Sequence, residues 1–242
     1  MKKFFISILS IVICLSACLP ISAATPNESL EEVENITAFI QNADTIKEED
    51  NYLQISKTTC LSNCSIISRS GDSIKSYSTE FMNIVPVDSA KLDEIKNEVY
   101  AARSGGGSNY KWINDKSLTI KMSLTIYYDE ITSGGDTYVN MTRIDGEVSG
   151  AGSGTYFSGG VRMSSAKANI TQQGCLIGGG ATFSQTVRND YSKQRTWTYS
   201  PSNWKPVAAV NGGSLVGVSY IVTLSRNSGS WDTELDNFLY EA

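Results

Sequence analysis

The sequence contains no histidine among its 242 residues. Ser-His-Asp and Cys-His catalysis use an imidazole as the general base, and many zinc sites use one as a ligand. The absence excludes these sites and leaves carboxylate, lysine, tyrosine or cysteine chemistry. We therefore expect a protein that is not an enzyme and that holds no metal or cofactor.

Positive charge is also scarce. The chain has 20 Lys and Arg against 25 Asp and Glu, for a formal net charge of −5. The excess of acid lies in residues 25–103, with 14 acidic and 7 basic residues, whereas residues 104–242 carry 11 of each. Nucleic-acid binding requires clustered Lys and Arg to neutralise phosphates. We predict no nucleic-acid partner.

Long apolar runs are absent except at the N-terminus. Lys2 and Lys3 precede an apolar segment, and small residues follow Pro20. This order is typical of a signal peptide over residues 1–24 and resembles those of Gram-positive exported proteins. Residues 15–18, Leu-Ser-Ala-Cys, also resemble the lipobox of bacterial lipoproteins, in which Cys18 is lipidated. We expect a secreted protein or, alternatively, one anchored by lipid at the outer face of the cytoplasmic membrane.

Beyond the signal peptide the chain has three cysteines, Cys60, Cys64 and Cys175. In an exported protein, the C-x3-C spacing of Cys60 and Cys64 favours a local disulfide across a turn. Two unpaired thiols are the alternative. Two cysteines without histidine supply too few ligands for zinc, so the pair is a disulfide candidate and no metal site is predicted.

The most regular pattern is the alternation of apolar and polar residues over 117–128. Side chains alternate faces along a strand, so this segment predicts an antiparallel strand with one buried face. Residues 216–224 repeat the alternation, and a change of parity within 137–148 predicts a bulge near Arg143. The pattern of residues 110–242 therefore predicts an antiparallel β-sandwich domain, with a small β-barrel as the alternative.

Residues 25–103 predict a small acidic α+β region, which would precede a Gly/Ser linker at residues 104–109. Apolar residues at helical spacing predict helices over 27–50 and 88–103. The first of these could instead be an acidic tether. Between the helices we expect a hairpin or three-stranded meander that turns at the two cysteines. The region could also be a pro-segment of the domain that follows.

Basic and aromatic residues interleave over residues 188–206, in a domain that is otherwise neutral. Aromatic rings suit sugar faces, and guanidinium groups suit anionic polymers. Alternatively, the aromatic residues pack in the core and the charges decorate a hairpin. The candidate ligand-binding residues are Arg188, Tyr191, Arg195, Trp197, Tyr199 and Trp204.

The leading functional hypothesis is a non-catalytic extracellular binding module. Its partner would be an extracellular glycan, a cell-wall polymer or a protein, and it would meet the membrane only through a lipid anchor. Two alternatives stay open. A carboxylate-dependent hydrolase could use acidic residues near strand ends, such as Asp145 and Glu147. A membrane-active, pore-forming β-protein could release residues 138–173 as a hairpin.

Overall fold

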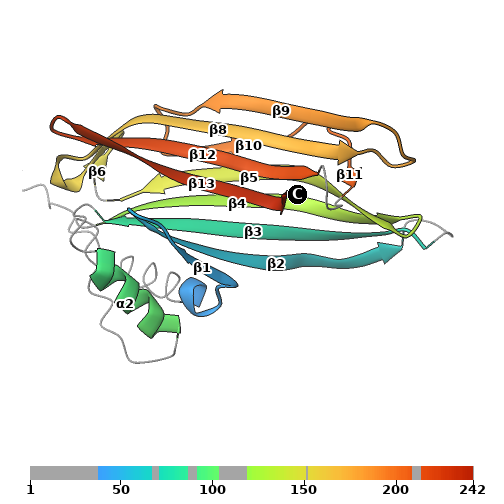
Figure 1. Ribbon diagram of the computed structural model, residues 1–242, viewed down its shortest axis with the longest axis horizontal. Helices are drawn as coiled ribbons and strands as arrows, with labels where there is room; N and C mark the ends of the chain where they lie inside the picture. The colour runs from blue at the N-terminus through green and yellow to red at the C-terminus, as the bar shows by residue number, and fades with distance from the viewer. Residues whose placement is uncertain are drawn as a thin grey trace, which may run out of the picture.

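The computed structural model describes residues 38–66, 71–86, 92–103, 119–150, 152–208 and 214–241. These residues form two antiparallel sheets that stack in two layers, with a helix and a shorter helical segment beside them (Figure 1). The predicted antiparallel β-sandwich with a small helical N-terminal part is thus confirmed. The predicted signal peptide, the lipobox with Cys18 and the linker at residues 104–109 lie outside the described residues.

The first sheet, sheet A, has the strand order β1-β2-β3-β4-β5-β10, and β11 also pairs with β5. Its strands are β1 (Thr45–Glu48), β2 (Leu53–Ile66), β3 (Ser73–Pro86), β4 (Thr119–Ser133), β5 (Asp136–Ser149), β10 (Thr196–Tyr199) and β11 (Val207–Ala208). Strands of 14 residues span about 48 Å at about 3.4 Å per residue, so the molecule is elongated along them.

The second sheet, sheet B, has the strand order β13-β12-β8-β7-β6, and β9 also pairs with β8. Its strands are β6 (Gly152–Ser153), β7 (Tyr156–Phe157), β8 (Arg162–Cys175), β9 (Thr182–Asp190), β12 (Leu215–Arg226) and β13 (Gly229–Glu241). A short 3-10 helix, η2 (Ser158–Gly160), lies between β7 and β8. β5 and β8, the two arms of the segment 138–173, therefore lie in different sheets.

The core lies between the two sheets and follows the predicted alternation. In β4 the apolar residues from Ile120 to Tyr128 are buried, and the intervening residues from Ser123 to Tyr127 are half-buried on the outer face. The segment 216–224 forms β12 and supplies the facing layer of the same core. The predicted bulge is present, because the pairing of β4 with β5 shifts between Arg143 and Met141.

The described strands that precede the predicted linker belong to sheet A. β3 pairs antiparallel with β4 along its whole length, from Ser73 opposite Thr132 to Pro86 opposite Thr119. The structure therefore joins part of the predicted N-terminal region to the later strands in a single sheet. β1 also replaces the end of the helix predicted over 27–50, since residues 45–48 pair with β2.

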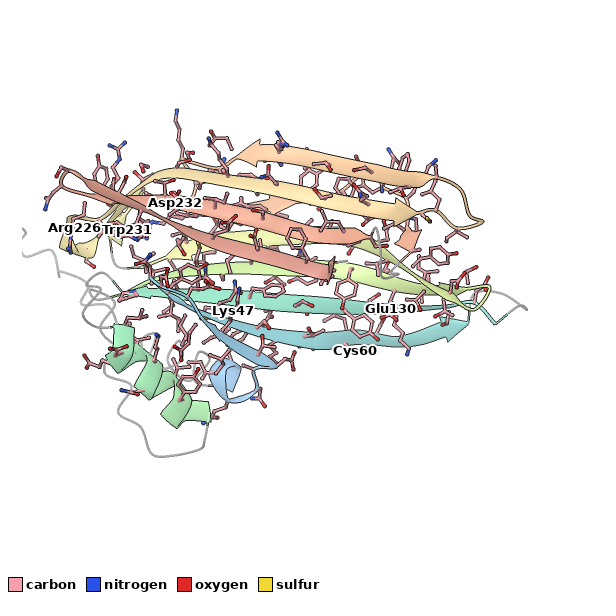
Figure 2. The ribbon with its side chains drawn as sticks, viewed as in Figure 1. Lys47, Cys60, Glu130, Arg226, Trp231 and Asp232 are labelled. Carbon is pink, nitrogen blue, oxygen red and sulfur yellow. The ribbon has the colours of Figure 1, made fainter. Side chains whose placement is uncertain are left out.

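The predicted turn at Cys60 and Cys64 is wrong, because β2 runs through both residues. Residues four apart in an extended strand lie about 13 Å apart, whereas a disulfide requires Cα atoms within about 7 Å. The pairing of β2 with β3 shifts register twice between Cys60 and Ser65. The Cys60 thiol is free and exposed (Figure 2), and it donates to the Ser62 carbonyl oxygen at 3.3 Å. Cys60 is thus unpaired in this structure.

A second, smaller core lies on the outer face of sheet A. The helix α2 (Leu92–Arg103) confirms the helix predicted over 88–103. Its residues Leu92, Ile95 and Val99 are buried, as the predicted apolar stripe requires. Ile95 and Val99 belong to a cluster of buried residues from the short helical segment 38–41, the turn after it and the strands β2 and β3: Ile40, Ala43, Leu53, Ile55 and Ile84. No helix among the described residues combines the length and apolar character needed to cross a bilayer.

Candidate functional site

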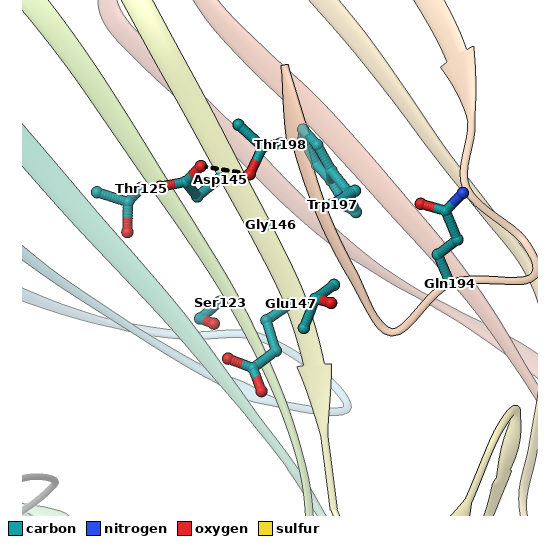
Figure 3. Close-up of a pocket in the computed structure, with 9 residues that line it drawn as sticks. Ser123, Thr125, Asp145, Gly146, Glu147, Gln194, Trp197 and Thr198 are labelled. Atoms are coloured by element: carbon teal, nitrogen blue, oxygen red, sulfur yellow. Dashed lines mark hydrogen bonds between the residues drawn. The ribbon is translucent and has the colours of Figure 1, made fainter. Parts of the chain in front are cut away.

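The outer face of sheet A changes character from β2 toward β10. At the start of β2 and the end of β3 it is apolar and belongs to the smaller core with α2. Toward β10 it is polar, because neighbouring outward residues of β4, β5 and β10 there are Ser, Thr, Asp and Glu. This polar part contains a pocket of about 460 Å3, which we call the outer-face pocket (Figure 3). Its lining residues are Ser123, Thr125, Asp145, Gly146, Glu147, Gln194, Thr196, Trp197 and Thr198.

Strand pairing arranges the polar lining residues in two parallel rows. In one row, Thr125 and Thr198 lie on either side of Asp145. In the other row, Ser123 and Thr196 lie on either side of Glu147. Each row therefore has the order hydroxyl, carboxylate, hydroxyl. Because Asp145 and Glu147 are two residues apart in β5, the rows lie about 7 Å from one another.

Asp145 is held in place by two hydrogen bonds. Its Oδ2 accepts from Nη2 of Arg143 at 2.6 Å, and its Oδ1 accepts from Oγ1 of Thr198 at 2.8 Å (Figure 3). The Asp145 carboxylate raises the pKa of Arg143. The Arg143 guanidinium also lies over the ring of Tyr127, 4.2 Å from its centre. Asp145 is thus oriented and its charge is balanced.

The Glu147 side chain differs from that of Asp145 because it makes no hydrogen bond or ion pair with another described residue, although its charge acts on Arg195 at longer range. The hydroxyl groups of Ser123, Thr125 and Thr196 likewise have no hydrogen-bond partner in the part of the chain that the structure describes. These four groups retain their donors and acceptors for water or for a ligand. The pocket therefore combines one fixed carboxylate with several available polar groups.

Gly146 and Trp197 support the pocket from behind. They pair across β5 and β10, and a Cβ at position 146 would overlap the indole ring of Trp197. Trp197 is only 5% exposed and belongs to the core between the sheets. Its ring stacks on Tyr191 at 4.2 Å and meets Tyr220 edge-on at 5.2 Å. This packing holds β10 against β5 and so positions Thr198 beside Asp145.

The structure does not bring the six predicted ligand-binding residues into one site. Trp197 is in the core, which is the alternative interpretation of this residue, and Tyr191 covers it. Tyr199 and Trp204 are half-buried and meet edge-on at 6.2 Å. The structure places Arg188 on β9, where it is exposed. The ligand-binding role of these residues stays a prediction.

Arg195, the sixth predicted residue, has a structural role. Its guanidinium donates hydrogen bonds to the carbonyl oxygens of Gly150, Gly154 and Tyr156. It also lies 4.2 Å from the ring centre of Phe157. Partial burial lowers the pKa of Arg195. The side chain thus fixes the connection from β5 to β7, next to the pocket residue Gln194.

A second pocket, of about 530 Å3, lies at one end of the sandwich. It is formed by the turn between β4 and β5, the turn after β8 and the strand β11, with Asp136, Tyr138, Cys175 and Ile177 among its lining residues. Its lining is more apolar than that of the outer-face pocket, and it lacks a second carboxylate. In neither pocket nor elsewhere in the described residues do three or more His, Cys, Asp or Glu residues gather as metal ligands would.

Sequence analysis identified Asp145 and Glu147 as acidic residues near strand ends but missed their hydroxyl partners. The signal that could have found them is the alternation of Ser and Thr in the segments 119–125 and 196–198. That signal becomes informative only with the strand pairing.

No family model, curated protein or solved structure matches the chain.

Proposed function

We propose that this protein is a non-catalytic extracellular binding module whose outer-face pocket takes a polyhydroxylated ligand, such as a cell-wall glycan. The observation that carries the proposal is the pair of hydroxyl–carboxylate–hydroxyl rows within one pocket. Sugar hydroxyls both donate and accept hydrogen bonds, so carboxylates and hydroxyls side by side complement them. The extracellular location rests on the predicted signal peptide.

Preorganisation supports the same proposal. Arg143 and Thr198 orient the Asp145 carboxylate before any ligand arrives. A side chain that is already ordered loses less conformational entropy on binding. The ligand would displace water from Ser123, Thr125 and Glu147, which keep their hydrogen-bonding groups available.

The test is calorimetric titration of the purified exported protein with soluble fragments of cell-wall glycan. Hydrogen bonds to charged groups contribute about 1.5–3 kcal/mol, so Asp145→Asn is expected to weaken binding about tenfold or more. The matched control is Asp136→Asn, which makes the same change in the second pocket. Equal affinities for Asp145→Asn and the wild-type protein, both folded, would show that ligands bind elsewhere.

A carboxylate-dependent hydrolase is the second candidate, and the spacing of Asp145 and Glu147 favours it. Their separation of about 7 Å along β5 is close to that of the carboxylate pairs in inverting glycosidases, roughly 6.5–9.5 Å. In that case Glu147→Gln would retain binding and lose the release of new reducing ends. If the wild-type protein binds a glycan and releases no reducing ends on prolonged incubation, the hydrolase candidate is wrong and the binding module stands.

A further inference from the structure

Edge strands of an antiparallel sheet expose unpaired backbone N–H and C=O groups, which can pair with a strand of another chain. Natural sheets protect such edges with short strands, bulges, charges or covering segments. The two sheets of this protein have four edges within the described residues: β2 with β1, β10 with β11, β13, and β9 together with the two-residue strands β7 and β6. Three of them are protected and the fourth is not.

The protection of the three edges takes different forms. β1 covers the start of β2, the Asp44 carboxylate accepts from the Thr58 N–H at 2.6 Å, and bulges follow. β10 and β11 have only 4 and 2 residues. β13 carries three carboxylates on one face, at every second position, which would repel a second copy: Asp232, Glu234 and Asp236.

β9 is not short or bulged, and its two charged residues, Arg188 and Asp190, are opposite in sign. Its 9 residues pair with β8 without a register shift, and they include no proline or lysine. Figure 1 shows β9 at the margin of the upper layer. Among the described residues, no strand pairs with its other side. It is therefore a regular, exposed and open edge of the kind that binds an added strand.

The hydrogen bonding of β8 with β9 shows which residues face the open side. The Tyr191 N–H donates to the Ala166 carbonyl oxygen at 2.7 Å. Hydrogen-bonded pairs recur at every second residue of an antiparallel ladder, so the odd-numbered residues of β9 face β8. The even-numbered residues present their N–H and C=O groups outward. They are Thr182, Ser184, Thr186, Arg188 and Asp190.

We propose that β9 pairs antiparallel with β9 of a second copy, so that sheet B continues across a twofold dimer. When the twofold axis passes through Thr186, all of β9 overlaps and about ten backbone hydrogen bonds form. Ser184 then faces Arg188, and Thr182 faces Asp190, so no like charges meet. An axis through Arg188 would place two guanidinium groups opposite one another, which disfavours that register.

The test is sedimentation velocity of the purified exported protein from about 1 to 100 μM, with thermal unfolding as a check on folding. We expect a dimer whose dissociation constant rises at least tenfold in Thr186→Lys, because two ammonium groups then meet at the twofold axis. Thr186→Pro removes an outward N–H and should have the same effect. If the proline variant does not fold, Thr186→Lys alone decides.

The matched control is Thr171→Lys on β8. Thr171 pairs with Thr186, and their hydroxyl oxygens are 3.3 Å apart, so both lysine variants lose the same hydrogen bond. β8 is an interior strand, and Thr171→Lys should therefore remain dimeric. A wild-type monomer at 100 μM would overturn the proposal. So would a Thr186→Lys variant that dimerises like the wild-type protein, or equal loss of dimer in both lysine variants.

Discussion

The contact of Gly146 with Trp197 makes a prediction about how the outer-face pocket is supported. In Gly146→Ala the new methyl group would overlap the indole ring. Trp197 cannot move away freely, because Tyr191 stacks on one face and Tyr220 meets it edge-on. Inserting a methyl group into a packed core costs about 1–3 kcal/mol. We expect Gly146→Ala to lower the free energy of unfolding by about that amount and to weaken ligand binding through displacement of β10.

A double-mutant cycle in urea tests the steric reason for this loss. In a Trp197→Ala background the methyl group has room, so Gly146→Ala should become neutral, or should stabilise by about 0.5–1 kcal/mol because alanine loses less backbone entropy than glycine. Trp197→Ala itself should cost about 3–5 kcal/mol. Gly229→Ala is the control, since its nearest neighbour would lie 3.6 Å away. Equal costs of Gly146→Ala in both backgrounds would refute the steric explanation.

Two further predictions concern residues behind the pocket. Arg195→Ala should lower the free energy of unfolding by about 1–3 kcal/mol, because the carbonyl groups of Gly150, Gly154 and Tyr156 lose a charged donor; urea unfolding measures this, and an unchanged midpoint would contradict it. Burial raises the pKa of Tyr220 to about 12. The unfolded tyrosine has a pKa of about 10, so the folded state holds the proton more tightly. The contribution of Tyr220 to the free energy of unfolding is therefore fully present below pH 10 and is lost as the pH rises from 10 to 12. Tyr220→Phe should therefore reduce the loss of stability over that range; an identical alkaline unfolding curve would argue against the role of this residue.

The alternation of residues within one strand predicted much of the fold. The parity of Ile120 to Tyr128 correctly identified the buried face of β4, and the parity change near Arg143 correctly located a bulge. Such patterns are local, because each side chain's face depends only on its neighbours in the strand. The pairing of β3 with β4 is not local. No local pattern in the Ser- and Thr-rich β2 and β3 specified β4 as the partner strand.

The candidate site was harder to predict for the same reason. Asp145 and Thr198 are 53 residues apart in the chain and form a hydrogen bond only because β10 pairs with β5. Trp197 was predicted as a ligand-binding residue because exposed aromatic rings suit sugars. Its burial depends on the missing side chain at Gly146, on another strand. Residue types therefore identified the acidic residues near the strand ends, whereas the position of their hydroxyl partners required the sheet topology.

The most direct test of the proposed binding site is a map of amide chemical-shift changes on titration of the protein with a soluble cell-wall glycan. The proposal predicts that the largest changes fall on β4, β5 and β10, at Thr125, Asp145, Glu147 and Thr198. Changes confined to Tyr199, Trp204 and Arg188 would contradict the outer-face pocket and favour the basic and aromatic segment instead. Saturable binding with no change at the pocket residues would likewise refute the account.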